Sequence, residues 1–91
     1  MNPAYSLLEP HVPQDWVRKP GGFSNLQRVP YYVKCWPVTK GKAWAYIDCF
    51  QDNVEVISRG PRIVIYLSDP DFVTKVLEAA AIACTWDEYR S

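Results

Sequence analysis

Aromatic and basic residues are interleaved in the stretch VKCWPVTKGKAWAYIDCF, residues 33–50. Aromatic rings on a strand can stack on nucleobases, each stack contributing about 1–3 kcal/mol, and lysine side chains neutralise phosphates. The same rings could instead close the core of a small domain. The stretch therefore predicts either a platform for single-stranded nucleic acid over residues 32–46 or a hairpin whose rings are buried. The residues concerned are Lys34, Lys40, Lys42, Trp36, Trp44 and Tyr46.

Catalytic motifs are absent from the sequence. It contains no glycine-rich phosphate loop, no HExxH or GxSxG motif, and a single histidine, His11, which lies among prolines. Asp48 and Lys34 are expected on the same face of the hairpin, and an exposed ion pair explains that placement better than an acid and its base. We therefore expect a protein that is not an enzyme and that uses no cofactor.

The three cysteines, Cys35, Cys49 and Cys84, are an odd number and include no CxxC pair. This pattern argues against the disulfide framework of a small secreted domain. With one histidine in the chain, the thiols also lack the spacing of a zinc site. Reduced thiols packed in the core are the expected state, and we expect no bound metal.

Composition and charge limit the function further. The 91 residues suffice for one domain, and 48% of them are hydrophobic and 14% aromatic, as in folded chains. Ten basic and ten acidic residues cancel, so no overall field draws the chain toward nucleic acid or an anionic membrane. The N-terminus has no basic and apolar signal segment, and no stretch approaches the roughly 18 apolar residues of a membrane span. We expect a cytoplasmic protein that does not contact membranes.

The first thirty residues differ from the rest of the chain. They contain five of the eight prolines, which disfavours a helix or a central strand, yet they carry too many apolar residues for a solvated linker. We expect residues 1–30 to form an irregular arm packed on the domain, with room for a short helix over Gln14–Lys19. Residues 31–91 then form the regular part of a single domain.

After residue 30, short runs of β-branched and aromatic residues alternate with turn residues, which predicts an antiparallel meander of four strands. A helix follows, because Ser68 or Asp69 can cap it, Pro70 suits its first position and apolar residues then recur every three or four positions. The fold class is therefore α+β, with one C-terminal helix across one face of the sheet. The expected strands are Tyr31–Val38, Ala43–Phe50, Val54–Ser58 and Ile63–Leu67, and the helix runs from Pro70 to about Thr85.

The turn around Gly41 determines the expected register of the first hairpin. A three-residue loop, Thr39 to Gly41, places Val38 opposite Lys42 and Trp36 opposite Trp44. One face is then wide and aromatic, open to the arm, a partner or nucleic acid, and the other is narrow and suited to an alanine-rich helix. The wide face comprises Tyr32, Lys34, Trp36, Val38, Trp44, Tyr46, Asp48 and Phe50, and the narrow face Val33, Cys35, Ala43, Ala45, Ile47 and Cys49.

The last strand, Ile63–Leu67, is apolar on both faces, which is typical of an interior strand. In a meander it would lie at an edge. Three arrangements would cover it: pairing with the arm, a strand order that differs from the sequence order, or pairing with a second chain in a homodimer.

Tryptophan, tyrosine and arginine anchor protein interfaces, and the chain has four Trp and six Tyr. Without a catalytic set, these residues favour a non-enzymatic protein-binding module, an inhibitor or adaptor. The small size is also typical of the inhibitors that phages and mobile elements direct at host defences, such as anti-CRISPR proteins. The alternative is a protein that binds single-stranded nucleic acid. The expected contact residues are Trp36, Trp44, Tyr46, Lys40, Lys42, Arg59 and Arg62, followed by Trp16 and Arg18 of the arm.

Overall fold

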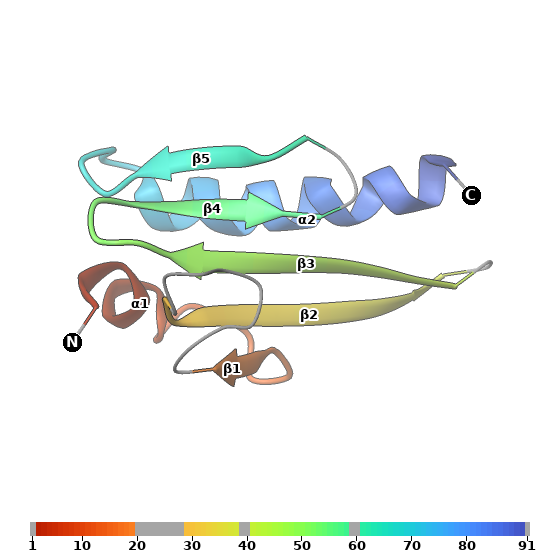
Figure 1. Ribbon diagram of the computed structural model, residues 1–91, viewed down its shortest axis with the longest axis horizontal. Coiled ribbons are helices and arrows are strands. Elements are labelled where there is room, and N and C mark those ends of the chain that lie inside the picture. The colour runs from red at the N-terminus through yellow and green to blue at the C-terminus, as the bar shows by residue number, and fades with distance from the viewer. Residues whose placement is uncertain (1, 20–28, 39–40, 59–60, 91) are drawn as a thin grey trace.

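Five antiparallel strands form one sheet, and they follow each other across it in sequence order (Figure 1). The computed structural model describes residues 2–19, 29–38, 41–58 and 61–90, and it describes their side chains except at 34–38, 41–43 and 84–90. The expected α+β class is confirmed, with five strands instead of four. The strands are β1 (Val17–Lys19), β2 (Tyr31–Val38), β3 (Gly41–Cys49), β4 (Asn53–Ile57) and β5 (Ile63–Tyr66), and the helices are α1 (Pro3–Leu8) and α2 (Phe72–Arg90).

The additional strand comes from the N-terminal arm. Residues 17–19 form β1 and pair with β2, so the helix considered for Gln14–Lys19 is wrong. The short helix of the arm lies earlier, at α1, where Pro3 occupies the first turn and needs no N–H partner. Asn2 caps this helix: its Oδ1 accepts the Tyr5 N–H (2.9 Å), and its Nδ2 donates to the carbonyl oxygen of Cys49 (2.8 Å).

The register of the β2–β3 hairpin differs by one residue from the expected one. Val38 pairs with Gly41, and Trp36 pairs with Ala43 instead of Trp44. Gly41 is therefore the first residue of β3 and not part of a three-residue loop. Since side chains alternate along a strand, this shift moves every β2 residue to the opposite face relative to β3.

One face of the sheet, which we call the back face, carries the helices. Figure 1 shows α2 running behind β4, and the helix contacts β3, β4 and β5. Side chains of β2, β3, β4 and β5 are buried there against the apolar side of α2, and side chains of the arm belong to the same core. The core includes Tyr32, Ala45, Ile47, Val54, Val56 and Ile65 of the sheet, Val76, Ala80 and Ala83 of α2, and Ala4, Leu8, Val12 and Trp16 of the arm.

The other face, turned toward the viewer in Figure 1, is called the front face. Its residues follow from the strand registers and the alternation of side chains. The arm was one of three possible covers for the wide aromatic face, and residues 2–16 instead pack against Tyr32 on the back face. The front face carries Val17, Lys19, Tyr31, Val33, Trp44, Tyr46, Asp48, Asn53, Glu55, Ile57, Val64 and Tyr66.

The C-terminal helix begins two residues later than expected and ends later, at Arg90. Before it, an Asp69 carboxylate oxygen accepts the N–H of Asp71 (2.9 Å), and Lys75 Nζ lies 2.6 Å from the other oxygen. Within the described ranges, neither helix has the length and apolar character needed to cross a membrane.

Candidate functional site

The densest polar cluster that the structure describes links the arm to the back face. The Tyr32 hydroxyl lies 2.9 Å from Glu9 Oε2 and 2.8 Å from the carbonyl oxygen of Tyr5, and its single proton is shared between these acceptors. The rings of Tyr5 and Tyr32 are stacked, with centroids 4.4 Å apart. Burial, followed by the hydrogen bond to Glu9, raises the pKa of Tyr32 well above its usual value. Tyr32 therefore stays protonated at neutral pH and holds the arm in place.

Arg18 completes this cluster. Its Nε lies 3.0 Å from Glu9 Oε1, and its Nη1 and Nη2 donate to the carbonyl oxygens of Trp16 (3.0 Å) and Val12 (2.9 Å). The guanidinium also lies over the Tyr32 ring, 5.7 Å from the centroid. Trp16 is buried. Arg18 and Trp16, expected as secondary contact residues, are thus engaged within the fold.

Three aromatic rings lie side by side on the front face. Trp44 and Tyr46, both expected as contact residues, have centroids 5.2 Å apart, and Tyr31 lies 5.8 Å from Tyr46. The ring planes are tilted by 60° and 57°, and Tyr31 is only 3% exposed. Trp44 and Tyr46 are half-buried, so part of each ring faces solvent.

The other expected contact residues are distributed differently. Trp36 and Trp44 were expected to be cross-strand neighbours, but Trp36 pairs with Ala43 and Trp44 pairs with Cys35. Lys42, in β3, lies opposite Pro37 of β2. Arg62 is exposed and immediately precedes β5. Lys40 and Arg59 lie outside the described residues.

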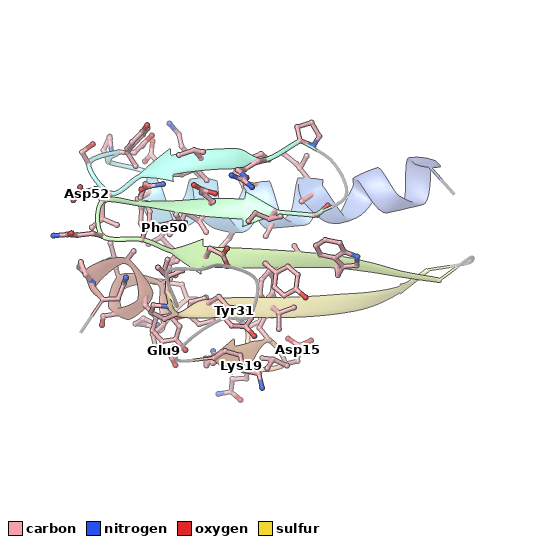
Figure 2. All side chains as sticks on the ribbon, viewed as in Figure 1. Glu9, Asp15, Lys19, Tyr31, Phe50 and Asp52 are labelled. Carbon is pink, nitrogen blue, oxygen red and sulfur yellow. The ribbon has the colours of Figure 1, made fainter. Side chains whose placement is uncertain are left out.

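A row of paired residues across the front face includes charges of both signs. The row runs Lys19, Tyr31, Asp48, Glu55 and Val64, each residue opposite the next on the neighbouring strand. Figure 2 shows the first two, Lys19 on β1 and Tyr31 on β2. Asp48 is 1% exposed.

The observed register also rules out the expected pairing of Asp48 with Lys34. Tyr31 is the partner of Asp48 on β2, and Lys34 pairs with Ala45. Glu55 instead has a basic neighbour, since its Oε1 lies 3.2 Å from Arg62 Nη1. The alternation in NVEVI already indicates that Glu55 faces away from the buried valines, although sequence analysis did not select it.

Exposed apolar side chains extend the front face to both edges of the sheet. Val17 on β1 is 47% exposed, and Val64 and Tyr66 on β5 are 43% and 60% exposed. Val64 and Tyr66 were not among the expected contact residues, because the apolar run 63–67 was expected to be covered by the arm, by a neighbouring strand or by a second chain. A terminal strand has only one neighbour, so its front-face residues remain in contact with solvent.

The described residues contain no group of three or more His, Cys, Asp or Glu side chains arranged to hold a metal ion. No protein-family model, no curated protein and no solved structure matches the chain.

Proposed function

We propose that this chain is a non-enzymatic protein-binding module, an inhibitor or adaptor that binds a folded protein partner through its front face. The observation that carries the proposal is the position of the exposed apolar side chains. Val17, Val64 and Tyr66 all belong to this face, and half-buried Trp44 and Tyr46 lie between them. Aromatic anchors surrounded by smaller apolar and polar residues are typical of protein interfaces.

The charges on this face favour a protein over a polyanion. Lys19 and Arg62 are balanced by Asp48 and Glu55 among the described residues. A nucleic acid laid across this face would bring its phosphates toward the carboxylate of Glu55, whereas a protein surface can match both signs of charge. Single-stranded nucleic acid remains the alternative, and the adjacent rings of Trp44 and Tyr46 favour it.

A pair of matched variants tests the proposal. Val17 on the front face and Leu7 on α1 are both 47% exposed, so replacing either with lysine adds the same charge at the same exposure. We expect Val17→Lys to lose a stoichiometric partner that the wild-type chain captures from host lysate, and Leu7→Lys to retain it. Trp44→Ala, which removes an anchor of the face, should weaken capture at least about tenfold.

The capture is performed with and without nuclease, and thermal unfolding of each variant confirms the fold. A protein partner that survives nuclease and is lost only with the front-face variants supports the proposal. A partner that binds Val17→Lys and Trp44→Ala as tightly as wild type contradicts it. Recovery of nuclease-sensitive material alone replaces it with the nucleic-acid alternative.

A further inference from the structure

The two edges of the sheet differ in how they are protected from pairing. β1 has three residues, two of which are the cations Arg18 and Lys19, and a short charged strand resists the addition of another strand. β5 ends the sheet on the other side, and no described strand pairs with its outer edge. Its four residues, IVIY, contain no charge and no proline.

The backbone of β5 presents unpaired groups along this edge. Leu67 donates its N–H to the carbonyl oxygen of Asp52 (2.9 Å), which makes Leu67 and Asp52 a hydrogen-bonded pair of the β4–β5 ladder. Such pairs alternate along an antiparallel ladder, so Ile63 and Ile65 also direct their backbone groups toward β4. Val64 and Tyr66 therefore direct theirs away from the sheet. Among the described residues, the Tyr66 carbonyl accepts the N–H of Asp69 (3.0 Å).

We propose that two copies of this chain pair antiparallel through β5, with Val64 opposite Val64 of the second copy, so that the two sheets become one. This register joins outward-directed residues on both strands over the whole of β5. It also places Arg62 of each copy opposite Tyr66 of the other.

The side chains in this register complement each other. Arg62 and Tyr66 lie two positions on either side of Val64, so a two-fold axis at Val64 brings a guanidinium beside an aromatic ring twice. On the front face Val64 meets Val64, and on the back face Ile63 meets Ile65. The formal net charge of the chain is zero, so the copies do not repel each other as wholes. These features favour a second copy over an unrelated strand as the occupant of the edge.

A charge-swap experiment tests both the pairing and its register. Val64→Lys places two ammonium groups at the two-fold axis and Val64→Glu places two carboxylates there, and each should weaken self-association at least about tenfold. An equimolar mixture of the two variants should restore a dimer, because lysine then faces glutamate. Val17→Lys, the same change at the opposite edge, should leave the dimer intact. Sedimentation equilibrium measures the mass in each case.

Hydrogen exchange of the wild-type chain gives a second readout that needs no substitution. The amides of Val64 and Tyr66 face the free edge and should exchange rapidly in dilute solution and become protected as the concentration rises. The amides of Ile63 and Ile65, already in the ladder, should be protected throughout. A wild-type chain that stays monomeric, a Val64→Lys variant that still dimerises, a mixture that stays monomeric, or unchanged exchange at Val64 would each overturn the proposal.

Val64 belongs both to the proposed front-face interface and to the edge of β5, whereas Val17 belongs to the front face alone. Val17→Lys should therefore lose the protein partner and keep the dimer, and Val64→Lys should lose the dimer whether or not the protein partner is retained. The two variants therefore separate a failure of one proposal from a failure of the other.

Discussion

At the scale of single residues, two arginines in ion pairs are expected to differ greatly in their contribution to stability. Arg18 forms an ion pair with Glu9 and donates hydrogen bonds to two backbone carbonyls, and its side chain is 25% exposed. Because charged hydrogen bonds in a partly buried site contribute about 1.5–3 kcal/mol, Arg18→Ala should lower the free energy of unfolding by about 2 kcal/mol or more. Urea denaturation measures this change.

Arg62→Ala is the matched control. Its side chain is 62% exposed, and its ion pair among the described residues is with Glu55. Exposed pairs contribute about 0–1 kcal/mol, so this substitution should change the unfolding free energy by less than about 1 kcal/mol. Equal losses in the two variants would show that the arm does not depend on Arg18.

The thiol of Cys49 gives the unfolding free energy a specific dependence on alkaline pH. Burial, and then the nearby Asp48, raise the pKa of Cys49 from its ordinary value of 9.0 to about 12. The protonated thiol is therefore favoured in the folded state, and its contribution to stability is complete below pH 9 and lost progressively from pH 9 to about 12.

At about pH 10 the thiol is largely ionised in the unfolded chain and protonated in the folded chain, which removes on the order of 1 kcal/mol. Cys49→Ala has no thiol to ionise, so its stability should fall less between neutral pH and pH 10 than that of the wild-type chain. Urea denaturation of both proteins at each pH isolates the difference, because all other groups titrate in both. A constant difference between them would contradict the raised pKa of Cys49.

Single residues on the hairpin were the hardest to predict from the sequence. Trp44 and Tyr46 were correctly placed on one face, but Trp36 and Lys34 were assigned to that face by a register that is one residue off. The error comes from the expected three-residue turn, since Gly41 is instead paired with Val38. Composition could not correct it, because Tyr31, Tyr32 and Val33 are all apolar or aromatic and the pattern in β2 does not distinguish its two faces.

At the scale of elements, α2 approaches the sheet through alanines. Ala80 is fully buried, and the following residue, Ala81, is exposed. Ala80→Leu adds three carbons to a close contact and should cost about 1–3 kcal/mol through overpacking. Ala81→Leu adds the same atoms in solvent and should leave the unfolding free energy within about 0.5 kcal/mol. Thermal unfolding compares them, and equal melting temperatures would contradict the close packing of α2.

Elements with strong local signals were predicted well, and elements that depend on distant contacts were not. β2 to β5 and α2 follow from runs of β-branched residues and from three-to-four-residue spacing. α1 has only six residues, and its cap Asn2 binds the carbonyl of Cys49, far away in the sequence. β1 likewise exists because Val17–Lys19 meets β2. Neither contact leaves a periodic signal in the arm.

At the scale of the whole molecule, both helices pack on one face of the sheet, and exposed apolar side chains gather on the other. Both helices pack on the back face and contribute to its core, so neither helix covers the aromatic and charged residues of the front face. The sequence left open whether the arm, a partner or nucleic acid covers the aromatic face. The arm packs on Tyr32 through its stack with Tyr5. The expected register placed Tyr32 on the aromatic face with Asp48, whereas Tyr32 pairs with Ile47 and lies on the back face.

Charge balance across the whole chain yields a final prediction about any captured partner. With ten basic and ten acidic residues and both signs on the front face, protein binding should rest mainly on apolar and aromatic contacts. Such affinity should change by less than about threefold when salt rises from about 50 to about 200 mM, whereas six to ten phosphate contacts would lose about 10³–10⁵ in affinity. A binding titration of the purified partner at several salt concentrations measures the slope. A steep fall would identify the ligand as nucleic acid and assign the rings of Trp44 and Tyr46 to base stacking, while a shallow slope together with loss of binding in Trp44→Ala would assign them to a protein interface.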